Sequence, residues 1–399
     1  MSRRTVIAAL GVTQILAWGS TYYLPAVLAE PIARETHWPL TWVVGGLSLG
    51  LLVAALVSPR VGRTIEKHGG GGMLAASAVA IGAGQIGLAL SPNLAVFIAA
   101  WLVIGVGMGA GLYDAAFATL GRLYGHDARS AITTLTLFGG LASTVCWPLS
   151  AAMVAALGWR ETCLVYAAIQ LVGALPLYMF AIPRHAITNA AHVDRAPERG
   201  TPRLQNPPGA LLALLVVTLT LASSLSSLVS VHLLTFLQSG GLALGAAVAL
   251  GALVGPSQVA ARAIELAISR FHHPIWTKFA SVTFVAVGLT TLWTGLPVLP
   301  AALGFYGAGI GLESIARGTL PLALFGPTGY STLMGRLAMP SLVAQAAAPW
   351  IGAKSLEVIG TGGTLGFLAV VAILNVLLTT ALGLIVRRSR SLKSPQFSA

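Results

Sequence analysis

The sequence L-A-V-F-I-A-A-W-L-V-I-G-V-G-M-G-A-G-L-Y-D-A-A-F-A-T-L-G occupies residues 94–121 and contains one charged residue, Asp114. An α-helix needs about 20 consecutive apolar residues to cross a lipid bilayer, so this run predicts a transmembrane helix. Its glycines, from Gly105 to Gly111, lie inside the apolar run. A phosphate-binding loop instead connects a strand to a helix, so the glycines favour close packing of membrane helices.

Apolar runs of this kind fill most of the chain. Of the 399 residues, 56% are hydrophobic and 9% are charged, whereas a soluble domain has about 25% charged residues. The predicted spans are 6–29, 40–64, 73–91, 94–121, 131–156, 161–182, 209–236, 242–264, 276–294, 299–324, 337–356 and 364–386. We therefore expect an all-α membrane protein with twelve transmembrane helices. A cleavable signal peptide is the alternative for the first run, but that run is longer than such peptides usually carry.

The positive charges predict the orientation. Of the 23 Lys and Arg residues, only Arg34, Arg160 and Lys354 lie at outer ends, and Arg317 lies within a span, if both termini are cytoplasmic. All others, Lys278 among them, then lie at cytoplasmic ends. This asymmetry follows the positive-inside rule. The net charge of +12 is thus a topology signal, and we expect a plasma (bacterial inner) membrane protein that binds no nucleic acid.

An internal repeat divides the chain into halves. Several residues of 94–121 recur at an offset of two hundred: Gly107 with Gly307, Gly109 with Gly309, Gly111 with Gly311, and Thr119 with Thr319. The motif R-T-I-E at 63–66 similarly matches R-A-I-E at 262–265. We predict an N-terminal six-helix bundle at 1–182, a cytoplasmic linker at 183–208, a C-terminal six-helix bundle at 209–388 and a cytoplasmic tail at 389–399. Such paired halves are found in secondary transporters.

The loop G-R-T-I-E-K-H-G-G-G-G at 62–72 carries the most specific signature. It resembles the loop G-x-x-x-D-[RK]-x-G-[RK]-[RK] of the major facilitator superfamily, with Glu66 in the acidic position, although Gly70 and Gly71 replace the usual basic residues. The resemblance implies the superfamily's fold of two pseudo-symmetric six-helix bundles. It also implies an acidic residue that helps latch the halves in the outward-facing state; a simple interfacial pair is the alternative. The candidate latch residues are Gly62, Arg63, Glu66, Lys67, Gly69, Arg262 and Glu265.

Three charged residues lie deep within predicted spans and are functional candidates. At about 1.5 Å per residue, Asp114 lies about 12 Å and Glu313 about 16 Å from a span end. Arg317 follows Glu313 by four residues, a spacing at which the two can pair on one helix face. Asp114 is a candidate proton carrier, or alternatively a carboxyl group hydrogen-bonded between helices.

Uncharged polar residues supply further candidates for hydrogen bonding to a small solute. Ser223, Ser227 and Ser230 share one face of a predicted helix, which lines a cavity or permits close helix packing. His232 lies near the outer end of that helix and is either titratable or structural. The remaining candidates are Tyr113, Gln14 and Gln345.

These features predict a secondary transporter of a small organic solute. No G-K-[ST] phosphate loop is present, so the proton is the expected driving ion, and no cofactor or metal is expected. A carboxylate is favoured because Arg317 is a counter-charge for it if Glu313 is protonated, and the chain loosely resembles oxalate/formate and monocarboxylate porters. Drug efflux is the alternative, although the antiporter signature of the fifth span is not reproduced. A non-transporting receptor is a further alternative; an enzyme is not expected. We expect a monomer in the lipid bilayer.

Overall fold

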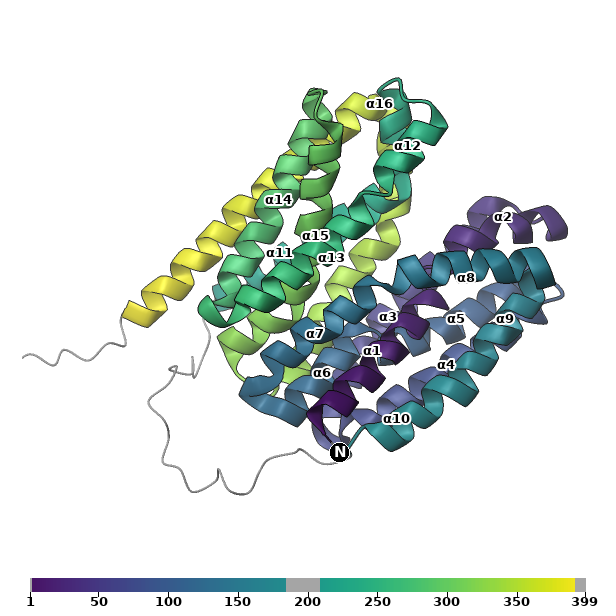
Figure 1. Cartoon of the computed structure of the whole chain (residues 1–399), viewed down its shortest axis with the longest axis horizontal. Helices are drawn as coiled ribbons and strands as arrows, with labels where there is room; N and C mark the ends of the chain where they lie inside the picture. Colours follow the sequence, from purple (N-terminus) through teal and green to yellow (C-terminus); the bar gives the residue numbers. More distant parts are fainter. Residues whose placement is uncertain (1, 184–208, 392–399) are drawn as a thin grey trace, which may run out of the picture. The chain divides into compact units, whose positions relative to one another are not determined.

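The structure is a computed structural model that describes residues 2–183 and 209–391 (Figure 1). The predicted linker at 183–208 and tail at 389–399 therefore lie almost wholly outside the described residues. Within the described ranges the chain is helical and contains no strand. The all-helical membrane fold class predicted from the sequence is confirmed.

The helices of residues 2–183 cover the first six predicted spans, several of which contain a break. They are α1 (Arg3–Gly19), α2 (Pro25–Thr36), α3 (Leu40–His68), α4 (Gly70–Ala89), α5 (Leu94–Gly111), α6 (Tyr113–Tyr124), α7 (Ala128–Gly140), α8 (Ala142–Leu157), α9 (Trp159–Ala168) and α10 (Leu175–Ala181). A π-helical turn, Ile169–Ala174, connects α9 to α10.

The helices after the linker are α11 (Gly209–Ser239), α12 (Leu244–Gly251), α13 (Val254–Ile268), α14 (Pro274–Thr294), α15 (Leu299–Phe325) and α16 (Tyr330–Ser391). Two compact units result, one of Met1–Ala186 with Gly329–Trp350 and the other of Ile187–Thr328 with Ile351–Ala399. Helix α16 contributes its first part to the N-terminal unit and continues in the C-terminal unit. It contains a kink at Gly360, where φ is 68°.

Nine helical segments of the described residues are long and apolar enough to cross a membrane. Two of them, Leu94–Leu157 with 64 residues and Tyr330–Arg388 with 59 residues, are long enough to cross twice, since one crossing needs about 20 residues. Helix α1, with 17 residues, is slightly shorter than that. The described helices accommodate twelve spans, and that number stays a prediction.

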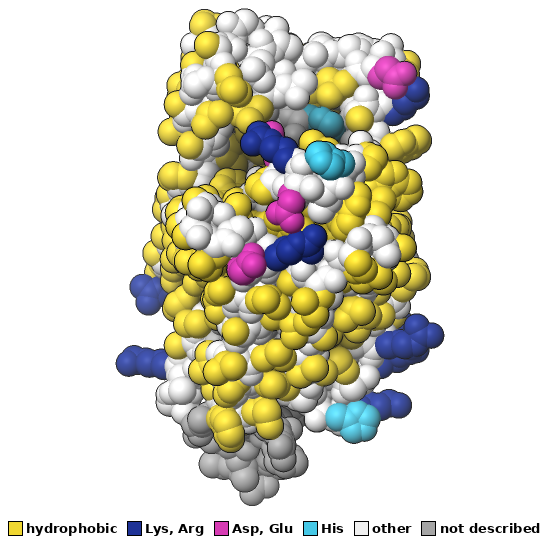
Figure 2. All heavy atoms as spheres, turned by 90° about the vertical axis from the view of Figure 1, so that its right-hand side faces the viewer, with side chains coloured by type: hydrophobic (Ala, Val, Ile, Leu, Met, Phe, Trp, Pro, Cys, Tyr) yellow, Lys and Arg dark blue, Asp and Glu magenta, His cyan; other side chains and the backbone are white. Residues whose placement is uncertain are grey.

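The surface is also that of a membrane protein. Large apolar side chains are exposed on many helices, for example Val172 at 77% and Phe180 at 74%. Figure 2 shows a face on which hydrophobic side chains cover most of the area and charged side chains are sparse. A soluble monomer rarely exposes large apolar patches. The apolar surface of this chain is instead suited to contact with lipid.

The first predicted span is interrupted, in contrast to the continuous helix expected at 6–29. Helix α1 ends at Gly19 and α2 begins at Pro25. The hydroxyl groups of Ser20 and Thr21 donate to backbone carbonyls four residues earlier, at 2.7 and 2.6 Å, so they compete with the helical hydrogen bonds. The buried amides of Gln85 and Gln170 donate to the Ser20 carbonyl and hydroxyl oxygens. These bonds satisfy the polar groups of the break inside the unit.

Glycines allow α5 and α15 to approach their neighbours closely. A Cβ atom at Gly105 would collide with the carbonyl oxygen of Gly50 on α3. In the second half, Cβ atoms at Gly307 and Gly309 would lie 2.6 and 2.7 Å from the carbonyl oxygens of Val254 and Ser281. The prediction that the glycine-rich run serves helix packing is confirmed.

Candidate functional site

An ion pair lies inside the C-terminal unit. The Lys278 ammonium on α14 donates to Glu313 Oε1 on α15 at 2.5 Å and to the Thr218 carbonyl on α11 at 3.2 Å. Lys278 is fully buried, and the Glu313 side chain is 15% exposed. The second carboxylate oxygen of Glu313 accepts a hydrogen bond from Ser281 at 2.8 Å. Both carboxylate oxygens therefore have donors from α14.

Arg317 extends this group of ionised residues toward α11. Its Nη1 atom donates to the Ser223 hydroxyl at 3.1 Å. One helical turn separates Arg317 from Glu313 on α15, so three helices of one unit contribute to the group. We call Ser223, Lys278, Ser281, Glu313 and Arg317 the C-terminal polar cluster. It contains two basic residues and one acidic residue.

Sequence reasoning missed Lys278. The charge census placed it at a cytoplasmic end, and the spacing rule paired Glu313 with Arg317. The structure instead gives Glu313 a cation from the neighbouring helix α14. The sequence did contain a signal for this pair. Lys278 lies inside the predicted span 276–294, and the intramembrane carboxylate of Glu313 needs a counter-charge.

The other candidates on α11 have different environments. Ser227 is 4% exposed and faces the unit's interior, whereas Ser230 is exposed. The His232 ring lies against Gly352, where an added Cβ atom would be 2.5 Å from the imidazole, and its centroid is 6.3 Å from that of Phe236. Ser223 belongs to the C-terminal polar cluster through its hydrogen bond with Arg317.

Asp114 lies next to a break in the fourth predicted span. Leu112 has an extended backbone with ψ of −170°, so α5 ends at Gly111 and α6 begins at Tyr113. Asp114 is therefore in the first turn of α6, where the helix dipole favours a negative charge. It is partly buried and lines a narrow recess with residues including Ser58 and Gly62 of α3.

Two candidate glutamines bind backbone carbonyls. The fully buried Gln14 of α1 donates to the Gly111 carbonyl at 2.6 Å, which has lost its helical partner at the break. Gln345 donates to the Ser341 carbonyl of its own helix at 3.3 Å. These bonds give Gln14 a structural role at the α5–α6 break.

The residues that resemble the family signature lie mostly in helices, since α3 continues to His68 and α4 begins at Gly70, and not in the loop expected at 62–72. Those at the end of α3 contact the start of α16. The Glu66 carboxylate accepts hydrogen bonds from the backbone N–H groups of Gly329 at 3.3 Å and Ser331 at 3.1 Å. The Arg122 guanidinium donates to the Glu66 carbonyl. A Cβ atom at Gly62 would collide with the Ser331 carbonyl oxygen. Arg63 and Lys67 are exposed, and Gly69 ends α3 with φ of 89°.

The repeated motif in the second half has other contacts. Glu265 is 4% exposed and accepts a hydrogen bond from Thr277 at 2.7 Å, with His272 Nε2 at 3.4 Å from its other oxygen. Arg262 is equally buried and donates through Nε to the Gly311 carbonyl at 3.2 Å. The repeat thus preserves the residues, but Glu66 and Glu265 bind different partners.

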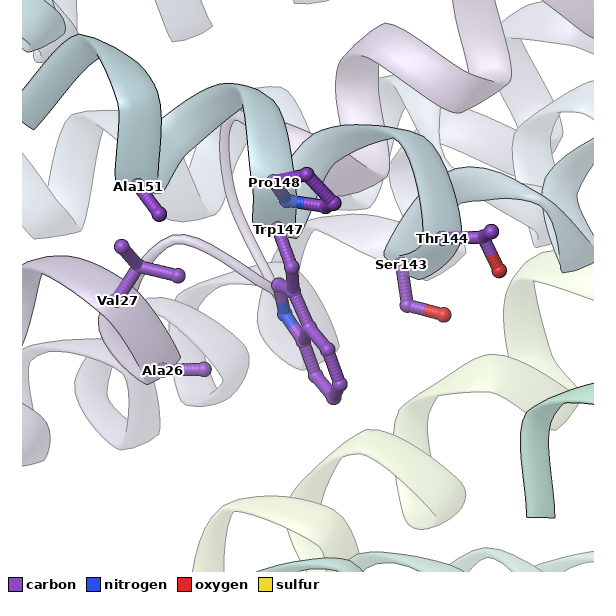
Figure 3. A pocket seen from close by; sticks show the side chains of 7 residues that line it. All are labelled: Ala26, Val27, Ser143, Thr144, Trp147, Pro148 and Ala151. Carbon is purple, nitrogen blue, oxygen red and sulfur yellow. The ribbon is translucent and has the colours of Figure 1, made fainter. Parts of the chain in front are cut away.

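Aromatic rings connect the neighbourhood of Asp114 to a pocket in the N-terminal unit. Tyr113 lies 5.1 Å from Trp18, Trp18 lies 6.0 Å from Tyr23, and Tyr23 lies 5.9 Å from Trp147, measured between ring centroids. Trp147 projects from α8 into an open pocket of about 590 Å³ that α2 borders (Figure 3). Pro148 lines the same pocket and, lacking an N–H, leaves the carbonyl four residues earlier without its helical donor.

Charged side chains within apolar helices, with breaks in several predicted spans, define the chain as a polytopic membrane transporter by class. The sequence model of the Major Facilitator Superfamily matches residues 10–271, more than half of the chain. The chain therefore belongs to the major facilitator superfamily. This confirms the resemblance seen in the loop at 62–72.

Solved structures of the superfamily share the fold. The human organic anion transporter MFSD10 has a TM-score of 0.71 at 16% identity, covering 95% of this chain and 100% of that chain. The fucose:proton symporter FucP of E. coli, in the outward conformation, has 0.70 at 12%, covering 94% and 98%. The proton:xylose symporter XylE has 0.66 at 13%, covering 94% of both chains. No curated protein sequence matches with significance.

Proposed function

We propose that the chain is a proton-coupled transporter of a small organic anion, with a carboxylate as the preferred group. The observation that carries this proposal is the C-terminal polar cluster, in which the basic residues Lys278 and Arg317 and the acidic residue Glu313 lie in the membrane-spanning part of the unit. Basic side chains in a low-dielectric region attract anions. The similar structure of an organic anion transporter agrees with this substrate class.

Arg317 is the proposed anion-binding residue. A guanidinium group offers donors in a fork that matches a carboxylate, and Ser223 holds one of its nitrogens at 3.1 Å. The charge of Glu313 is compensated by Lys278. Because Lys278 pairs with Glu313, anion binding by Arg317 does not require a protonated Glu313, as sequence reasoning had assumed.

Asp114 is the proposed proton carrier. It lies in the first turn of α6, beside the break in the fourth predicted span, and lines a narrow recess of the N-terminal unit. Two of the structurally similar proteins are proton symporters by name, which agrees with proton coupling. We further propose, from the distribution of Lys and Arg, that both termini are cytoplasmic in a bacterial inner membrane.

The test uses the purified full-length chain in liposomes under an imposed pH gradient, screened with radiolabelled organic anions and with cationic dyes. We expect accumulation of at least one carboxylate. Arg317→Gln should abolish it, and Arg317→Lys, which keeps the charge but loses the fork, should raise KM. Transport of dyes without any anion would refute the anion proposal. Binding without transport would instead indicate a receptor.

A drug efflux antiporter is the second candidate function, and the aromatic rings of the N-terminal unit favour it. Their faces carry partial negative charge and attract cations, and the Trp147 pocket of about 590 Å³ is within the range of drug-sized sites. Proton-driven extrusion of a cationic dye that Trp147→Ala weakens, while Trp147→Phe preserves it, would support this alternative.

A further inference from the structure

Lys278 is enclosed more completely than any other charged residue for which the structure gives a burial value. Its side chain has no solvent exposure, and its ammonium contacts one carboxylate oxygen and one backbone carbonyl. A buried ammonium without a counter-charge is strongly unfavourable. The stability of Lys278 in this place therefore depends on an ionised Glu313.

The dependence is mutual. Lys278 contacts one oxygen of Glu313, and the Ser281 hydroxyl lies 2.8 Å from the other oxygen and 2.9 Å from the Gly309 carbonyl. A proton on Glu313 would remove the negative charge that compensates the buried ammonium of Lys278. Protonating Glu313 during transport would thus cost the ion pair.

We propose that Lys278 is a positioning residue that keeps Glu313 ionised and docked on α14 throughout the transport cycle. The C-terminal polar cluster then carries a constant charge, and the coupling proton binds elsewhere in the chain. The role of the pair in transport rests on the proposed function, whereas its ionisation state does not.

The ionisable groups that face Glu313 are few. They are Lys278 on α14, Arg317 one turn later on α15, and Arg262 of α13, whose Nε atom binds the Gly311 carbonyl near Glu313. From α11, Ser223 and the Thr218 carbonyl contribute polar groups that do not titrate, and α12 (Leu244–Gly251) contains no ionisable side chain. In Lys278→Met, Glu313 is consequently the one group expected to change its ionisation.

The first measurement is the thermal stability of the purified protein from acidic to mildly alkaline pH. In Lys278→Met, the native state contains a buried carboxylate without its ammonium and should take up a proton more readily than the unfolded chain. Stability relative to wild type should therefore rise as the pH falls. The double variant Lys278→Met/Glu313→Gln removes both charges and should lose this pH dependence. Lys354→Met, which removes an exposed lysine, is the matched control and should show no such change.

The second measurement is substrate counterflow in liposomes with an anion that wild type transports. Lys278→Met should reduce counterflow at neutral pH by about tenfold or more, as expected for a broken buried ion pair, and acid should partly restore it. The double variant should be more active than the single variant at neutral pH. If Lys278→Met cannot be purified, we expect the double variant to restore the yield of folded protein.

Three results would overturn the inference. The first is a Lys278→Met variant whose stability depends on pH as that of wild type does, and the second is a double variant that keeps the new acid dependence. The third is a double variant that yields no more folded protein than a Lys278→Met variant that cannot be purified. A wild-type protein that transports no anion would refute the proposed function instead. The stability measurement would still decide whether Lys278 keeps Glu313 ionised.

Discussion

Replacing Glu66 by Gln should weaken the contact between the C-terminal end of α3 and the start of α16. The carboxylate accepts bonds of 3.3 and 3.1 Å from the N–H groups of Gly329 and Ser331, at a helix N-terminus whose dipole favours a negative charge. Charges in such partly buried positions contribute up to about 2 kcal/mol. Because one bond is long and the other is of ordinary length, we expect a loss of about 1–2 kcal/mol, which corresponds to roughly a 5–30-fold change in a conformational equilibrium.

The assay uses Ser331→Cys as a reporter in both the parent and the Glu66→Gln protein. Ser331 is 1% exposed, and Cys replaces its hydroxyl with little change in volume while leaving the backbone N–H in place. The native cysteines, Cys146 and Cys163, are both buried. An impermeant maleimide added to inside-out vesicles should label the Glu66→Gln protein roughly 5–30 times faster than the parent.

The matched control is Glu357→Gln. Glu357 is exposed and pairs with Lys354 at 3.0 Å, an interaction of about 0–1 kcal/mol at a surface, so the labelling rate should stay unchanged. If Glu66→Gln labels within twofold of its parent, the hydrogen bonds from Gly329 and Ser331 do not hold the start of α16 against α3, and the proposed role of Glu66 at this contact fails.

Three further predictions concern the N-terminal unit. Asp114→Asn should abolish anion accumulation driven by a pH gradient while counterflow persists; unchanged proton dependence would exclude Asp114 as the proton carrier. Gln14→Leu leaves the Gly111 carbonyl without its donor and should destabilise the protein by about 1–3 kcal/mol, seen as a lower unfolding temperature with an unaltered KM. Gly105→Val should prevent the close approach to Gly50 and reduce the yield of folded protein, whereas the same change at Gly45, which has open space around it, should be tolerated.

Hydrophobicity and glycine spacing predicted the parts of the fold that depend on one segment at a time. The run at 94–121 gave a membrane helix because the bilayer requires apolar length, and its glycines gave close packing because small residues let backbones approach. The break after Gly111 was not predicted, since Leu112 is an ordinary helix-forming residue. Its extended conformation depends on a partner in another helix, Gln14, which binds the exposed carbonyl. Hydropathy contains no information on such pairings.

The same limit explains the candidate site. A sequence rule can pair Glu313 with Arg317, because residues four apart share a helix face, but Lys278 lies on another helix and becomes a neighbour only when α14 packs on α15. The positive-inside rule also counts every lysine near a span end alike, whether its ammonium faces water or is enclosed. Lys278 belongs to the second kind, since it is fully buried. An intramembrane carboxylate in a predicted span should therefore be tested against every cation on the helices that pack beside it before its proton is assigned a role in coupling.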